Sequence, residues 1–188
     1  MSVCDSIKSL NPYQGGKPIS ELQRELGLDR VVKLASNENP LGVGQKTLEA
    51  MQVAITEVDR YPDGNGFELK QAIGQHLKVA NDQVTLGNGS NDILELVARA
   101  YVCTKQDEVV FSQFAFVVYP LVTQALGAKA VITKSKDFGH DLEAMLLAIT
   151  DNTKLIFIAN PNNPTGTLLD DSAIHAFLSR VPNSITVV

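Results

Sequence analysis

The stretch LIFIANPNNPTGTLL, residues 155–169, decides how the rest of the chain is interpreted. Its first part, residues 155–158, is an apolar run typical of a buried strand, and a segment rich in asparagine, proline and glycine follows directly. Pro161 and Pro164 fix the backbone and each removes an N–H donor, so a rigid turn is expected where this strand ends. Such a turn is either a stiff connection, in which Asn163 caps its own backbone, or a support that holds the Asn163 amide toward a cleft.

Strand-like and helix-like segments alternate along the chain around this stretch. Short apolar runs predict strands at residues 84–86, 109–111, 130–132, 155–158 and 185–188. Apolar residues at helical spacing predict helices at residues 48–55, 69–77, 93–101, 119–126, 142–149 and 174–181. Asp141 suits a helix N-cap and Gly127 a helix C-cap. The alternation predicts an α/β fold, in which a mostly parallel sheet is flanked by helices on both faces.

The composition is that of an ordinary globular protein, with 44% hydrophobic and 20% charged residues in a chain of 188. The net charge of −5 argues against nucleic acid as a partner, because phosphate binding requires a positive surface. Cys4 and Cys103 form no disulfide framework, and no spacing of ligand residues indicates a metal site. The start lacks the apolar core of a signal peptide and no apolar run approaches membrane-spanning length, so neither a membrane nor export is expected and the predicted location is cytoplasmic.

The last residues, 185–188, begin another apolar strand, and the sequence stops there. In open α/β sheets the chemistry lies just beyond the carboxyl ends of the strands. We therefore expect the chain to be a fragment that lacks the next functional loop.

The segment GNGSND, residues 87–92, connects a predicted strand to a predicted helix. Glycines let a backbone approach a ligand closely, and free N–H groups at a helix start favour an anion. Ser90 adds a hydroxyl donor. An ordinary capped helix start is the alternative, because Ser, Asn and Asp are all good N-caps. The segment matches neither the Walker loop nor the dinucleotide-binding glycine motif, which counts against a nucleotide-binding domain.

Several motifs together resemble one family. Residues 160–166, NPNNPTG, resemble the N-P-x-N-P-T-G turn of the fold-type I pyridoxal-phosphate aminotransferases, and residues 89–91 lie upstream at the position of that family's phosphate cup. Three further segments resemble the histidinol-phosphate aminotransferase branch: PYQGGK at 12–17, LASNENPLG at 34–42 and RYPDG at 60–64. The resemblance covers essentially the whole chain, and several motifs in the correct order are more specific than any single one.

The resemblance implies a domain organisation. The sheet would be the incomplete large domain of a fold-type I pyridoxal-phosphate-dependent transferase. Residues 1–40 would form an N-terminal arm and a substrate-side segment, and residues 41–188 a partial cofactor-binding domain.

The resemblance also implies residues that bind pyridoxal 5′-phosphate. The phosphate would be held by Gly89, Ser90 and Asn91. Asn163 would hydrogen-bond the phenolic oxygen and so tune the electronics of the cofactor. Phe116 matches the ring that stacks on the pyridine, where many relatives carry tyrosine, although ordinary core packing is the alternative. Tyr61 would reach across a homodimer interface to the partner's cofactor phosphate.

The substrate contacts implied by the resemblance lie near the start of the chain. Tyr13 would belong to an arm that covers the active site, and Asn37 and Glu38 match a segment near the substrate. A polar surface loop is the alternative for Asn37 and Glu38.

The catalytic groups of the family have no match in the sequence. The family requires a Schiff-base lysine, an aspartate at the pyridine nitrogen and an arginine for the substrate carboxylate, and we expect all three beyond Val188. The three histidines match no motif and are expected at the surface or on helix faces: His76, His140 and His175.

The function implied for the parent enzyme is transamination of the small molecule L-histidinol phosphate with 2-oxoglutarate, in histidine biosynthesis, while the chain alone would be inactive. Two alternatives stay open. One is another fold-type I enzyme, either an aromatic aminotransferase or a lyase or decarboxylase acting on a phosphorylated amino acid. The other is a non-catalytic α/β scaffold for dimerisation.

Overall fold

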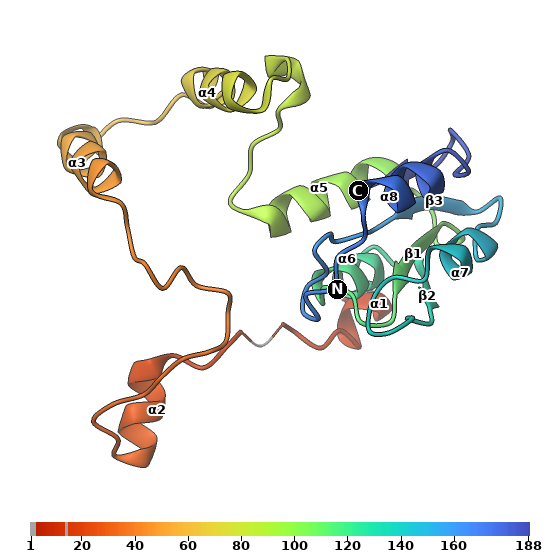
Figure 1. The fold of residues 1–188 in the computed structure, drawn as a ribbon, viewed down its shortest axis with the longest axis horizontal. Helices are drawn as coiled ribbons and strands as arrows, with labels where there is room; N and C mark the ends of the chain where they lie inside the picture. The colour runs from red at the N-terminus through yellow and green to blue at the C-terminus, as the bar shows by residue number, and fades with distance from the viewer. Residues whose placement is uncertain (1–2, 14) are drawn as a thin grey trace. The chain divides into compact units, whose positions relative to one another are not determined.

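The structure is a computed structural model that describes residues 3–13 and 15–188. These residues form two compact units. Unit 1 joins residues 3–13 to residues 87–188, and unit 2 contains residues 15–86 (Figure 1). The predicted boundary between residues 40 and 41 does not coincide with these units, and it stays a prediction.

Unit 1 is built around a parallel sheet. Its strands in the described residues are β1 (Glu108–Ser112), β2 (Lys129–Thr133), β3 (Thr153–Ile156) and β4 (Thr186–Val187), in the order β2-β1-β3-β4. In the central strand β1, Val109 lies opposite Ala130 on one side and Leu155 on the other, and every residue of β1 is buried. A strand buried on both faces is continuously apolar rather than alternating, which is why this sheet could be predicted from runs of Val, Ile and Leu.

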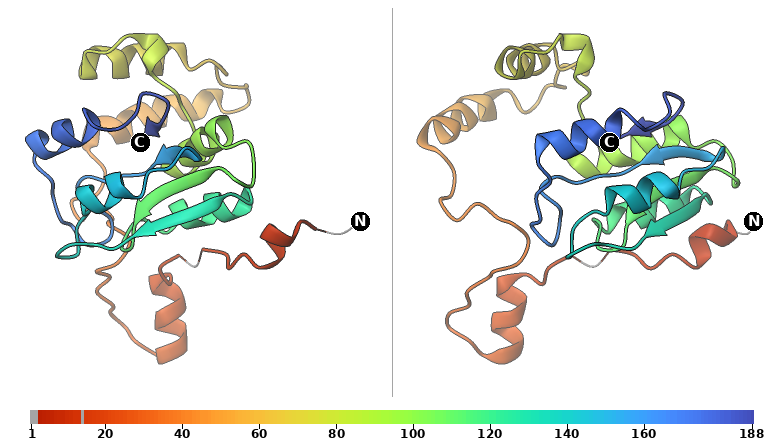
Figure 2. Two further views of the ribbon diagram at one scale, coloured as in Figure 1. Left: turned by 90° about the vertical axis from the view of Figure 1, so that its right-hand side faces the viewer. Right: turned by 45° about the vertical axis from the view of Figure 1, so that its right-hand side comes forward.

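Helices cover both faces of the sheet, as the alternation predicted (Figure 2). The helices on one face are α5 (Ser90–Tyr101) and α6 (Val118–Ala125), and those on the other are α7 (Leu142–Leu147) and α8 (Asp171–Leu178). Side chains of a strand alternate between faces. Val109 and Phe111 therefore pack with α5 and α6, whereas Val110 packs with Met145 of α7 and Phe177 of α8.

The helix ends follow the predicted caps. The Asp141 carboxylate accepts a hydrogen bond of 3.0 Å from the Ala144 N–H at the start of α7. Gly127 follows the end of α6 with a φ of +72°, a conformation that glycine adopts without strain. The structure thus confirms the predicted start of α7 and the predicted end of α6.

Residues 84–86 differ from the prediction. Val84 is extended, but residues 84–86 form no strand in the described chain. A strand needs a neighbour for its backbone hydrogen bonds, and no described strand pairs with this segment. The strand predicted at residues 155–158 is present but begins and ends earlier, at Thr153 and Ile156. Beyond it, the Phe157 and Ile158 N–H groups still donate hydrogen bonds to the Val110 and Val188 carbonyls.

The N-terminal segment of unit 1 contains α1 (Asp5–Lys8), which lies against α6. The Gln124 side chain donates a hydrogen bond of 3.1 Å to the Ser9 hydroxyl. The segment is thus fixed to the helix layer.

Unit 2 consists of helices joined by extended connections. They are α2 (Ile19–Leu26), α3 (Gln45–Ala54), α4 (Phe67–Leu77) and the short 3-10 helices η1 (Ile55–Glu57) and η2 (Asn81–Gln83). The helices predicted at 48–55 and 69–77 are confirmed. Gly74 is the only fully buried residue among residues 15–86, so the apolar faces of these helices are not covered within the unit. In the part of the chain that the structure describes, no helix is both long and apolar enough to cross a membrane.

Candidate active site

Functional residues gather at the carboxyl edge of the parallel sheet. The segments that leave this edge are 113–117 after β1, 134–141 after β2 and 157–170 after β3. Helix α5 begins at the same edge, because its C-terminal end leads through the short connection 102–107 into the start of β1. In open α/β sheets ligands bind at this edge.

The turn after β3 is held by its own hydrogen bonds. The Asn160 side chain both donates to the Leu169 carbonyl, at 3.0 Å, and accepts from the Leu169 N–H, at 2.9 Å. The Asn162 N–H donates to the Thr167 carbonyl and the Gly166 N–H to the Asn162 carbonyl, both at 2.8 Å. The turn is therefore a closed, rigid loop, as its prolines predicted.

The Asn162 side chain joins this turn to the loop after β1. Its Nδ2 donates to the Phe114 carbonyl at 2.9 Å and to the Thr165 hydroxyl at 2.7 Å. Because a carbonyl oxygen only accepts, Nδ2 must face Phe114, which fixes the orientation of the amide. The Oδ1 atom of Asn162 is then buried without a hydrogen-bond partner in the described structure.

Asn163 stands apart from the other two asparagines of the turn. It is half-buried, and its side chain makes no hydrogen bond to the described residues. Asn160 and Asn162 stabilise the turn, whereas the Asn163 amide is available to a ligand. The Asx-turn alternative for Asn163 finds no hydrogen bond in the described structure.

The start of α5 has features of an anion site. Gly89 has a φ of +86° and open space where a side chain would lie, and no side chain caps the helix. The N–H groups of its first turn therefore have no partner in the helix itself. The preceding turn is packed more tightly, since a Cβ at Gly87 would approach Asp92 to 3.0 Å. Ser90 and Asn91 are exposed.

Phe116 lies at the edge of an aromatic cluster on the α5 and α6 face. Its ring meets Tyr119 edge to face, with centroids 5.9 Å apart, and Tyr119 stacks on Phe157 at 4.4 Å. Burial raises the pKa of Tyr119, so this ring stays neutral. Phe116 itself is half-buried and packs against the core with part of its surface accessible.

Two polar residues at this edge were missed by the sequence analysis. His140 was expected at the surface or on a helix face, and that expectation is wrong: it lies in the loop before α7, it is 6% exposed, and its Nε2 lies 2.9 Å from the Ala159 carbonyl oxygen. Its Nδ1 is buried without a partner in the described structure, and so is the Ser112 hydroxyl at the end of β1. No motif could reveal them, because their burial depends on loops distant in sequence. His76 and His175 are exposed, as expected.

The remaining predicted site residues belong to other segments of the chain. Tyr13 is 55% exposed in unit 1. Unit 2 contains Tyr61, which is fully exposed, Asn37, with a φ of +48°, and Glu38, which pairs with Lys33. Within the PYQGGK motif, Gln14 lies outside the described residues. The roles of these residues stay predictions.

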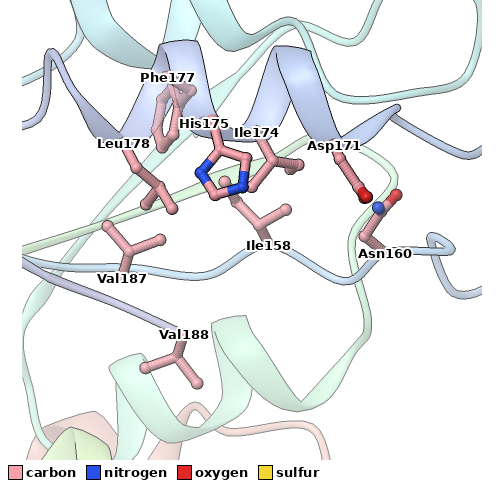
Figure 3. Close-up of a pocket in the computed structure, with 9 residues that line it drawn as sticks. All are labelled: Ile158, Asn160, Asp171, Ile174, His175, Phe177, Leu178, Val187 and Val188. Atoms are coloured by element: carbon pink, nitrogen blue, oxygen red, sulfur yellow. The ribbon is translucent and has the colours of Figure 1, made fainter.

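A separate hollow of about 360 Å³ lies between α8 and the edge strand β4 (Figure 3). Its walls are mainly apolar, with Ile158, Ile174 and Val187 facing the space and His175 beside them. None of the predicted cofactor residues lines it. The hollow adjoins the turn at Asn160, but it is lined by other residues than those predicted to bind the cofactor.

The residues at the carboxyl edge fit a planar aromatic phosphate ester. The uncapped helix start and Ser90 suit a phosphate, the free amide of Asn163 suits a polar ring substituent, and Phe116 offers a ring surface. The unpartnered Asn162 Oδ1 and Ser112 hydroxyl show that this edge retains polar groups that the protein alone does not satisfy.

Comparisons with known proteins agree with this geometry. The chain is 60% identical over 97% of its length to histidinol-phosphate aminotransferase 1 of Idiomarina loihiensis, and 56% identical over 97% to the histidinol-phosphate aminotransferase of Methylobacillus flagellatus. The structure of histidinol-phosphate aminotransferase from Sinorhizobium meliloti, in complex with pyridoxal-5′-phosphate, matches 98% of the chain with a TM-score of 0.88 at 26% identity. Aspartate aminotransferase from Thermus thermophilus, at 20% identity and a TM-score of 0.85, shares the fold. The chain spans about half the length of these relatives, 49% for the first.

The fold matches part of the large domain of the fold-type I pyridoxal-phosphate transferases, as the sequence predicted. Residues 29–188 match the family described as aminotransferase class I and II. The chain belongs to the aminotransferase class I and II family.

Proposed function

We propose that the protein containing this chain is a pyridoxal-phosphate-dependent histidinol-phosphate aminotransferase, which transfers the amino group of L-histidinol phosphate to 2-oxoglutarate in histidine biosynthesis. The observation that carries the proposal is the turn after β3, in which Asn160 and Asn162 are hydrogen-bonded and Asn163 is free. Identities of 52–60% to histidinol-phosphate aminotransferases support the same substrate.

The cofactor would be held by residues of unit 1. Its phosphate would be bound by the N–H groups of Gly89, Ser90 and Asn91 and by the Ser90 hydroxyl. These groups lie at the N-terminal end of α5, where the helix dipole favours an anion. The Asn163 amide would donate to the phenolic oxygen, and Phe116 would cover one face of the ring.

The chemistry that the cofactor supplies when bound is electron withdrawal from the amino-bearing carbon of the donor. The chain's own residues act by positioning. A hydrogen bond from Asn163 would favour the ionised phenolic oxygen and so would lower the proton affinity of that oxygen. The closed turn would keep this amide in place, and the edge-to-face contact with Tyr119 would hold the Phe116 ring.

The family resemblance implies further roles for residues outside the turn and α5. We propose that Tyr13, Asn37 and Glu38 contact the substrate, and that Tyr61 reaches the cofactor phosphate of a second subunit. A homodimer follows from the last assignment. The uncovered apolar faces of unit 2 support it, because such faces require a partner surface. We propose a cytoplasmic location for this homodimer.

The lysine that links the cofactor is proposed to lie outside residues 1–188. Two lysines of unit 1 at the amino edge of the sheet have partners there: Lys129 pairs with Glu108 and Lys154 donates to the Asp151 carbonyl. A lysine at the amino edge cannot serve a site at the carboxyl edge. Lys134 and Lys136 follow β2, but neither matches the family motif.

The test is an assay of the intact protein with pyridoxal phosphate. L-Histidinol phosphate and 2-oxoglutarate should yield glutamate, while L-phenylalanine as the donor should react much more slowly. Faster turnover of the aromatic amino acid would favour an aromatic aminotransferase. Release of carbon dioxide from a phosphorylated amino acid would favour a decarboxylase. No turnover and no cofactor binding would favour the non-catalytic scaffold.

A further inference from the structure

His140 is fixed on the main chain between two defined structures. On its N-terminal side, Lys136 and Gly139 form a small antiparallel bridge, in which the Gly139 N–H donates to the Lys136 carbonyl at 2.8 Å. On its C-terminal side, Asp141 caps α7. The backbone of His140 therefore has little freedom, and its side chain is 6% exposed.

The side chain of His140 holds the point at which β3 leaves the sheet. The Ile158 N–H donates a hydrogen bond of 2.8 Å to the carbonyl oxygen of Val188, the residue directly after β4. The next residue, Ala159, has its carbonyl oxygen 2.9 Å from Nε2 of His140. Because a carbonyl oxygen only accepts, Nε2 must carry a hydrogen and donate it. His140 thus continues the support of the chain beyond the ladder and directly before the turn.

The same loop also contacts the outgoing side of the turn. A Cβ added at Gly139 would lie 3.1 Å from the Thr167 hydroxyl, so the loop and Thr167 are already in close approach. Thr167 accepts, through its carbonyl, the N–H of Asn162. The loop 136–140 therefore supports both sides of the turn that presents Asn163.

The burial of the other ring nitrogen, Nδ1, is unfavourable, and the support that Nε2 gives to Ala159 offsets it. Nδ1 of His140 is buried and has no partner in the described structure. An apolar side chain of similar size would avoid this loss but would leave the Ala159 carbonyl without its donor. A histidine at residue 140, with Nδ1 buried and unpartnered, is therefore explained by the need for a donor to the Ala159 carbonyl.

We propose that His140 is a positioning residue for the cofactor site: its Nε2–H fixes Ala159, and through the turn it fixes the amide of Asn163. The inference rests on the proposed function, because it assigns Asn163 to the cofactor. It adds a residue that would act through Ala159 and the turn and that matches no family motif.

The first test needs no cofactor. Long-range ¹H–¹⁵N spectra of the intact protein, without pyridoxal phosphate, report which imidazole nitrogen carries the hydrogen. A hydrogen on Nε2 is expected for His140. A ring protonated at Nδ1 alone would contradict the bond to Ala159 and overturn the inference.

The second test compares His140→Leu with His140→Gln, whose amide can still donate from the ε position. His140→Leu should weaken pyridoxal phosphate binding by about tenfold, and His140→Gln should recover most of this loss. His175→Leu, at an exposed histidine of α8, is the matched control and should bind as the wild type does. If His140→Leu does not fold, the spectra and His140→Gln still test the inference. A folded His140→Gln that binds pyridoxal phosphate about tenfold more weakly than the wild type would overturn it.

A double-mutant cycle separates positioning from general stability. In an Asn163→Ala background, His140→Leu should change cofactor affinity by less than about twofold, because the group that it positions is already gone. An equal loss in both backgrounds would overturn the inference, and so would a lower melting temperature with unchanged affinity. Absence of binding by the wild type would instead overturn the proposed function and this inference together.

Discussion

The Asn162 amide donates a hydrogen bond of 2.9 Å to the Phe114 carbonyl, and this bond joins the turn after β3 to the loop after β1. The two residues are 48 positions apart in sequence. The bond distinguishes two adjacent asparagines: Asn162 stabilises the edge of the sheet, whereas the half-buried Asn163 makes no side-chain hydrogen bond to the described residues.

Asn162→Ala should destabilise the protein, because it removes the donor to Phe114 and the bond to Thr165 together. The expected loss in the free energy of unfolding is about 1–3 kcal/mol, measured by urea denaturation. Asn183→Ala, at an exposed asparagine, is the control and should change stability by less than about 0.5 kcal/mol. Equal stability of the two variants would contradict a structural role for Asn162.

Ser90→Ala should act on the phosphate and not on the ring of the cofactor. The affinity of the intact protein for pyridoxal phosphate should fall about tenfold, since a hydrogen bond to a charged group is lost. Affinity for pyridoxal, which lacks the phosphate, should not change. A similar loss for both ligands, measured by fluorescence titration, would place Ser90 elsewhere.

Phe116 should require an aromatic ring and no hydroxyl. Phe116→Ala is expected to weaken pyridoxal phosphate binding by about three- to tenfold, through lost stacking, while Phe116→Tyr keeps affinity near that of the wild type. Both variants should first be shown to unfold cooperatively. If Phe116→Ala binds pyridoxal phosphate as tightly as the wild type, the Phe116 ring serves core packing and does not stack on the cofactor.

Glu108 should make stability dependent on acid pH. Its buried carboxylate accepts hydrogen bonds of 2.6 Å from Lys129 and from Thr150, and these bonds hold its pKa below the ordinary value of 4.5. A carboxyl whose pKa is lowered on folding stabilises the protein above its unfolded pKa and loses that contribution as the pH falls through the folded value. The free energy of unfolding should therefore fall below about pH 4.5.

Glu108→Gln should be less stable than the wild type at pH 7, and the difference should narrow as the pH falls below 4.5. Glu143→Gln is the comparison at an exposed carboxylate, where pairing with Arg180 also lowers the pKa. Solvent screening should leave that variant close to the wild type. A constant difference between Glu108→Gln and the wild type at all pH values would exclude the linkage.

The sequence was sufficient where a local signal determines the structure. The apolar runs of β1, β2 and β3, the N-cap at Asp141 and the glycine after α6 each act within a few residues. The rigid turn was also local, because proline restricts its own backbone.

The sequence was insufficient where a partner is distant. Residues 84–86 have the composition of a strand, but a strand forms only beside another one. The burial of His140 depends on Ala159, 19 residues away, and no motif includes both. The hydrogen bonding of the Asn162 side chain depends in the same way on Phe114, which is 48 residues away.

The central claim is that Asn163 donates a hydrogen bond to the phenolic oxygen of pyridoxal phosphate. The most direct measurement is the affinity of wild type and Asn163→Ala for pyridoxal phosphate and for its 3-deoxy analogue, which lacks that oxygen. The account predicts that Asn163→Ala weakens binding of pyridoxal phosphate by about 10- to 100-fold and leaves binding of the analogue nearly unchanged. An equal loss for both ligands, or no loss for either, would contradict it.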